Sequence, residues 1–161
     1  MAEQFEVAEL VAVGVEDEKS GVAFYSLLAE RAGSAELRAT FADLARQESF
    51  HQKRFERMLA DLGGMPAREE YAGQYLAYVR VLTEERAFPD PQTARRMAEQ
   101  CAGDDAKAVD LALRFERDTL LLMNEMRVLV PARDQKVIDE LTREEKAHVV
   151  ALVAARDRQK K

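Results

Sequence analysis

Both histidines of this chain follow a glutamate at the same spacing, in two Glu-x-x-His pairs. Glu48 precedes His51, and Glu145 precedes His148. Residues three apart on a helix lie on the same face, so each carboxylate would stand beside an imidazole. Such a pair is either a surface interaction of about 0.2–0.5 kcal/mol or part of a metal site.

The surroundings of each pair favour a buried metal site. Apolar residues recur around both pairs at alternating steps of three and four, as on a helix face that packs in a core. One face comprises Leu37, Phe41, Leu44, Glu48, His51, Phe55, Met58 and Leu62, and the other comprises Ile138, Leu141, Glu145, His148, Leu152 and Ala155. Buried carboxylates without partners are costly, so the pattern predicts positive charge between these helices.

Two further glutamates interrupt apolar faces upstream of the pairs. Glu18 and Glu116 stand 30 and 29 positions before the glutamates of the two pairs. Their faces comprise Val11, Val15, Glu18, Val22, Tyr25 and Ala32, and Val109, Leu113, Glu116, Leu120, Met123 and Val130. Glu16 and Asp17 lie off the first face, and we predict that solvent surrounds both.

The combined set of four glutamates and two histidines matches the ligand pattern of di-metal carboxylate bundles. Four carboxylates carry four negative charges, which two divalent ions cancel. Carboxylate and imidazole ligands suit iron or manganese better than zinc. Bridging carboxylates hold two metals about 3.5–4 Å apart, close enough to act on one substrate together.

Composition excludes several other classes of protein. The formal net charge of −6 argues against nucleic acid as a partner. The N-terminal residues lack a signal-peptide pattern and no apolar run reaches membrane-spanning length, so we expect a cytoplasmic protein without membrane association. Cys101 is the only cysteine, which excludes an intrachain disulfide and a four-cysteine metal site. We expect it to fill space in the core.

Helical periodicity through most of the chain predicts an all-α protein with one domain over residues 1–161. The predicted long helices span about 5–32, 35–62, 105–130 and 135–158. Gly33 ends the first, Ser34 caps the second, and Gly63-Gly64-Met65-Pro66 ends it. Asp104-Asp105 suits the start of the third helix, and Asp134 is the predicted cap of the fourth.

The links between helices predict a four-helix bundle with a long crossover. Short links make antiparallel hairpins of helices one and two and of helices three and four, whereas residues 63–103 cross over between the hairpins. The crossover is predicted to be partly helical, with a break at Phe88-Pro89-Asp90-Pro91 before a helix over 92–101. One face of it carries Tyr71, Tyr75, Tyr78 and Leu82. We expect that face to pack against the bundle or a second subunit.

Two segments resemble the rubrerythrin branch of the ferritin-like superfamily. Glu18-Lys19-Ser20-Gly21-Val22-Ala23-Phe24-Tyr25 is similar to the first-helix signature of that family, and Leu44-Ala45-x-x-Glu48-x-x-His51 to its second-helix motif. The resemblance extends over nearly the whole chain and implies a ferritin-like four-helix bundle with a di-iron site.

The resemblance also implies roles for the six residues. Glu18 and Glu116 would be terminal ligands, and Glu48 and Glu145 would bridge the irons. The iron of Glu18 would take His51, and the iron of Glu116 would take His148. Tyr25 would be a hydrogen-bonding group near the irons, the alternative being a packed core tyrosine.

Several features distinguish this chain from known members of the superfamily. One cysteine cannot build the rubredoxin domain that commonly feeds electrons to the irons, so a reductant must come from another protein. Rubrerythrins commonly add a carboxylate one turn from the third-helix glutamate, where this chain has Leu113 on one side and Thr119 on the other. Without that carboxylate, the ligand set resembles that of bacterioferritin more closely. Ser49 replaces the haem-binding methionine of bacterioferritin, and no fifth helix follows, so a storage shell is disfavoured.

Three functions fit these observations. The first is rubrerythrin-like reduction of hydrogen peroxide, a defence against oxidative stress, with two Fe ions and an external electron-donor protein. The second is a ferroxidase or iron-handling protein that uses oxygen, and the third is a bundle in which metal only stabilises the fold. Manganese is the alternative metal. We also expect a homodimer, because the family often pairs bundles and the crossover offers an aromatic face.

Overall fold

The computed structural model describes residues 7–63 and 74–159, which form six helices and no strand. Helix α1 spans Val7–Arg31, α2 Ala35–Leu62, α3 Gln74–Glu84, α4 Pro91–Gln100, α5 Asp105–Leu129 and α6 Ala132–Gln159. The predicted all-α bundle with a long crossover is confirmed. None of the described helices is long and apolar enough to cross a bilayer.

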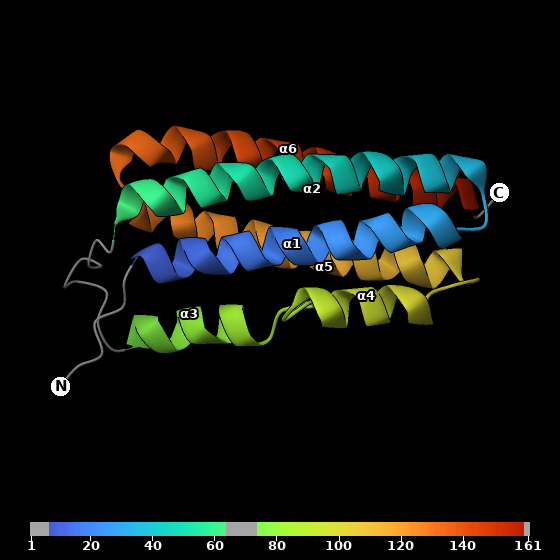
Figure 1. Cartoon of the computed structure of the whole chain (residues 1–161), viewed down its shortest axis with the longest axis horizontal. Coiled ribbons are helices and arrows are strands. Elements are labelled where there is room, and N and C mark those ends of the chain that lie inside the picture. Colours follow the sequence, from blue (N-terminus) through green and yellow to red (C-terminus); the bar gives the residue numbers. More distant parts are fainter. Residues whose placement is uncertain (1–6, 64–73, 160–161) are drawn as a thin grey trace.

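The four long helices lie side by side as two antiparallel hairpins, α1 with α2 and α5 with α6 (Figure 1). The short helices α3 and α4 run along the outside of the bundle, where α4 packs against α1 and α3 packs against α5. They carry the chain along the length of the bundle between the two hairpins. Each long helix can therefore turn one face toward the interior.

Polar side chains, glycine and proline fix the helix ends. The Ser34 hydroxyl caps α2 by accepting a hydrogen bond of 3.1 Å from an amide of the first turn, and Gly63 ends α2 with a φ of 55°. The predicted capping role of Asp134 is wrong, because α6 begins at Ala132 and Asp134 lies within its first turn. Pro131 has a φ already close to the helical value, so the helix starts directly after it.

The crossover enters the core through Phe88, which lies in the predicted break between α3 and α4. Phe88 is fully buried, and its ring centroid lies 4.5 Å from that of Phe24 and 4.9 Å from that of Phe115. Tyr78 of the predicted aromatic face is 44% exposed on α3. Two other members of that face lie outside the described residues, namely Tyr71 and the side chain of Tyr75.

Two apolar clusters fill the bundle, one on each side of its middle. The cluster near the α1–α2 turn includes Phe24, Phe41 and Cys101, which is buried as predicted for a space-filling cysteine. The other cluster includes Phe55 and Met123. The six predicted ligand residues are buried in the middle of the bundle, between the two clusters.

Candidate metal centre

All six predicted ligand residues converge in the middle of the bundle. Each is at most 1% exposed; they are Glu18 on α1, Glu48 and His51 on α2, Glu116 on α5, and Glu145 and His148 on α6. The apolar clusters on either side exclude water from this polar layer. Helix α1 comes especially close at Gly21, where a Cβ atom would lie 3.1 Å from Cγ of Glu48.

The donor atoms divide into two similar groups around two shared carboxylates. His51 Nδ1 lies 3.6 Å from Glu18 Oε2, and His148 Nδ1 lies 3.5 Å from Glu116 Oε2. We call the pair Glu18 and His51 half-site A, and the pair Glu116 and His148 half-site B. The two imidazole rings are nearly parallel, with centroids 5.3 Å apart and an interplanar angle of 14°.

Glu48 and Glu145 each turn one oxygen toward each histidine. Oε2 of Glu48 lies 3.8 Å from Nδ1 of His51, and Oε1 lies 3.2 Å from Nδ1 of His148. Oε1 of Glu145 lies 2.5 Å from Nδ1 of His51, and Oε2 lies 2.9 Å from Nδ1 of His148. This is the arrangement needed for two carboxylates to bridge two cations.

Several of these buried donor atoms lack a hydrogen-bond partner that meets ordinary geometry. They are both carboxylate oxygens of Glu18, Glu48 and Glu145, Oε2 of Glu116, and Nδ1 of both histidines. Buried polar atoms are normally satisfied, so a group of orphans that faces one centre calls for a ligand. Donor atoms of Glu48, His51, Glu145 and His148 all lie within 4.8 Å of one another, which suits a metal ion.

Electrostatics also favour a cation at this centre. Burial, followed by the charges of Glu48 and Glu145, raises the pKa of Glu18 and of Glu116 well above the usual range. Burial alone would lower the pKa of each histidine, but the surrounding glutamate carboxylates raise it far above 6.5. Protons thus balance the negative charge, and bound metal ions would displace them.

Each histidine has a second partner on its outer nitrogen. Nε2 of His51 lies 2.8 Å from Oε2 of Glu144, and Nε2 of His148 lies 3.1 Å from Oε1 of Gln47. Sequence reasoning did not identify Gln47 or Glu144. The available signal was their shared position directly before the glutamate of each Glu-x-x-His pair.

The Tyr25 hydroxyl donates a hydrogen bond to Oε1 of Glu116. Burial and, to a lesser extent, the negative charge of Glu116 raise the pKa of Tyr25, so the phenol stays protonated and acts as the donor. The ring is also fully buried and stacks on Phe41 with centroids 5.9 Å apart. The two alternatives expected for Tyr25 therefore both hold, because it is a packed core residue and also donates a hydrogen bond to a candidate ligand.

The prediction that solvent surrounds both Glu16 and Asp17 is wrong for Asp17. Glu16 is exposed as expected, but Asp17 is only 1% exposed. Its carboxylate accepts hydrogen bonds from the Thr119 hydroxyl at 2.8 Å and from Arg86 at 3.3 Å. Burial raises its pKa to about 7, although Arg86 acts in the opposite direction. The prediction failed because the crossover supplies Arg86 and covers this face of α1, which the bundle pattern alone leaves open.

Replacing Arg86 with methionine is expected to lower the free energy of unfolding by about 3–5 kcal/mol, because the Asp17 carboxylate would stay buried without its cation. Urea unfolding at pH 8 measures the loss, because the Asp17 carboxyl of the natural protein, with a pKa of about 7, is then mostly ionised and in the variant must either stay charged without Arg86 or take up a proton. The matched control is Arg127→Met, which breaks an exposed pair with Asp139 and should cost less than about 1 kcal/mol. Equal losses would contradict this role of Arg86.

Comparison with known proteins agrees with the site geometry. The sequence model of the rubrerythrin family matches residues 9–116 of the 161. The chain belongs to the rubrerythrin family. The matched range contains Glu18, Glu48, His51 and Glu116, whereas the remaining two candidate ligands lie beyond it on α6.

A solved structure of another protein is similar to this rubrerythrin-family chain over nearly its whole length, α6 included. It is a crystal structure from Thermotoga maritima, described as a candidate ferritin-like diiron-carboxylate protein. The two are 25% identical, and they align over 98% of each chain with a TM-score of 0.71. None of the curated proteins compared with the chain matches it. The ferritin-like fold therefore extends over α6, which carries the second Glu-x-x-His pair.

Proposed function

We propose that this protein is a di-iron carboxylate redox protein that reduces hydrogen peroxide to water with electrons from an external donor. The observation that carries the proposal is the pair of shared carboxylates, Glu48 and Glu145, each with one oxygen toward each histidine. Membership of the rubrerythrin family and the likeness to a ferritin-like diiron-carboxylate protein support it.

The donor set suits two divalent iron ions, with manganese as an alternative. Four carboxylates in a layer that is at most 1% exposed need compensating charge, and two divalent cations supply it. Zinc sites more often use three or four ligands of histidine and cysteine, and the only cysteine lies in the apolar core. Half-site A would hold one ion, half-site B the other, and the shared glutamates both.

In this mechanism the protein would hold the ions, orient their ligands and exclude water. Converting one hydrogen peroxide to two waters consumes two electrons and two protons, and a di-ferrous pair held by these six residues would supply the electrons. The outer hydrogen bonds to Glu144 and Gln47 would leave Nδ1 of each histidine to face the ions. A separate electron-donor protein would restore the ferrous state, because one buried cysteine cannot form a rubredoxin-type centre.

A specific observation favours a second function, oxidation of Fe(II) by oxygen. Thr119 stands where the family commonly adds a carboxylate, and its hydroxyl donates to Asp17 instead of facing the histidines. Without that additional carboxylate the candidate ligand set is closer to that of bacterioferritin. This would make the protein a ferroxidase or an iron-handling protein.

Anaerobic loading with iron(II) followed by separate exposure to hydrogen peroxide and to oxygen tests both functions. We expect about two ions per chain, as in other bundles with this ligand pattern, and faster oxidation by peroxide. Faster oxidation by oxygen would select the second function. Failure to bind iron would overturn both and leave a structural role for the six residues.

Replacing Tyr25 with phenylalanine is expected to weaken metal binding at half-site B by about tenfold, because Glu116 would lose the donor that fixes its carboxylate. Half-site A, which Tyr25 does not contact, should change little. Anaerobic cobalt(II) titration measures both affinities. Tyr78→Phe, which removes an exposed tyrosine hydroxyl, should change neither. Equal weakening of both sites by the Tyr25 variant would contradict a local role.

A further inference from the structure

The two halves of the centre are alike in their ligands but differ in what lies behind each histidine. Glu144 on α6 contacts His51, and Gln47 on α2 contacts His148. Both outer residues occupy the same place in their motif, directly before a shared glutamate. The difference between the half-sites is therefore a single functional group, a carboxylate behind His51 and an amide behind His148.

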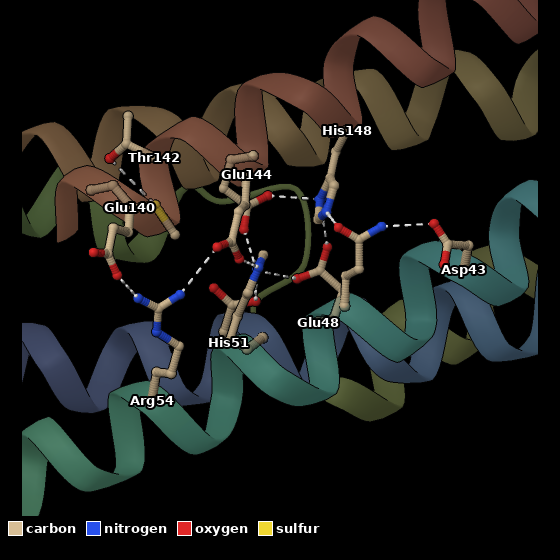
Figure 2. A network of polar contacts seen from close by, with 12 residues as sticks. Asp43, Glu48, His51, Arg54, Glu140, Thr142, Glu144 and His148 are labelled. Carbon is tan, nitrogen blue, oxygen red and sulfur yellow. Dashed lines mark hydrogen bonds and ion pairs between the residues drawn. The ribbon is translucent and has the colours of Figure 1, made fainter. Parts of the chain in front are cut away.

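The carboxylate behind His51 is held in place by an arginine. Arg54 donates to Oε1 of Glu144 at 3.2 Å and to Oε2 of Glu140 at 2.6 Å, while the other oxygen of Glu144 faces His51 (Figure 2). A carboxylate can only accept at this contact, so Nε2 of His51 carries the hydrogen. The ring therefore presents an unprotonated Nδ1 to an ion in half-site A once metal is bound.

The amide behind His148 is also fixed, but as a neutral acceptor. The Gln47 amide nitrogen donates to Oδ2 of Asp43 at 2.8 Å, and Asp43 is paired with Arg46. Because Asp43 can only accept, the amide nitrogen must face it and the amide oxygen must face His148. His148 also donates through Nε2, but to an uncharged group.

We propose that the two metal positions are unequal, and that half-site A binds a divalent ion more tightly and fills first because Glu144 makes His51 the stronger ligand. A hydrogen bond to a carboxylate is stronger than one to an amide and raises the basicity of the imidazole. Outer partners of this kind change metal affinity by about 10–100-fold, which is the difference expected between the positions. The proposal rests on the proposed function, in that the centre must bind two ions.

Reciprocal substitutions test the proposal without any measurement of activity. Anaerobic titration with cobalt(II) alone, followed by absorption and calorimetry, gives both affinities. Glu144→Gln should weaken the tighter site by about 10–100-fold and make the two nearly equal. Gln47→Glu should tighten the weaker site by a similar factor. Such a gain of affinity cannot come from misfolding, so the second variant stands even if the first is unstable.

Glu140→Gln is the matched control. Glu140 lies on α6 and is also paired with Arg54, but among the described residues it makes no hydrogen bond or ion pair with His51, so its loss should leave the ratio of affinities unchanged. If Glu140→Gln and Glu144→Gln act alike, the effect is a general one of surface charge and the proposal fails.

Anomalous diffraction from crystals that contain one cobalt per chain locates the first ion. We expect it beside Glu18 and His51. Occupation of half-site B first, equal occupation, or affinities that respond to neither substitution would overturn the proposal while leaving a di-metal centre intact. Absence of any bound cobalt or iron would instead overturn the proposed function.

Discussion

Replacing Glu48 with alanine is expected to weaken metal binding at both half-sites by about 100-fold or more, because each ion loses a direct ligand. Its two oxygens face different histidines, at 3.8 Å from Nδ1 of His51 and 3.2 Å from Nδ1 of His148. Metal content after anaerobic loading with iron(II) and desalting measures the effect. We expect about two ions per chain in the natural protein and almost none in the variant.

Two further variants make the Glu48 result specific. Glu18→Ala removes a carboxylate that faces only His51 among the histidines, so it should affect half-site A more than half-site B. Glu16→Ala removes an exposed glutamate paired with Lys19 and should leave both ions bound. Retention of one tightly bound ion in the Glu48 variant would mean that Glu48 serves a single ion.

The candidate ligands were predictable because helix periodicity alone determines which residues face the bundle interior. Glu48 and His51 interrupt an otherwise apolar face between Leu44 and Phe55, and all of these residues are buried. The same reasoning placed Glu18 and Glu116 correctly in the core. A long helix fixes the direction of its side chains without knowledge of its neighbours.

Contacts that depend on neighbouring elements could not be predicted in the same way. Asp17 is buried and accepts hydrogen bonds from Arg86, 69 positions later in the crossover, and from Thr119 on α5. Gln47 and Glu144 lie at the edges of their helix faces, and periodicity does not tell whether an edge position faces solvent or a histidine on the opposite helix. These contacts follow from how α2 and α6 face one another, which the sequence of either helix does not contain.

Removal of the metal is expected to lower the thermal stability substantially. Ions present at about 1,000 times their dissociation constants stabilise the folded state by about 4 kcal/mol each. For two ions in a chain of this size, about 8 kcal/mol corresponds to a shift in Tm of about 15–30 °C. Thermal unfolding of chelator-treated and iron-loaded protein under anaerobic conditions measures it.

The metal-free protein should also lose stability as the pH rises from 6 to 8. Glu18, Glu116 and both histidines have pKa values raised in the folded state, whereas unfolded glutamate and histidine titrate near 4.5 and 6.5. Over this range the folded state therefore holds more protons than the unfolded state, and a state that holds more protons is weakened when pH rises. Bound metal replaces those protons, so the difference in Tm between loaded and metal-free protein should widen toward pH 8.

The Glu48→Ala variant separates stabilisation by the bound ions from a general action of the chelator. If the ions stabilise the fold through the shared carboxylates, iron should raise the Tm of the natural protein but not that of the variant. A similar metal-dependent shift in both proteins would place the stabilising ions elsewhere.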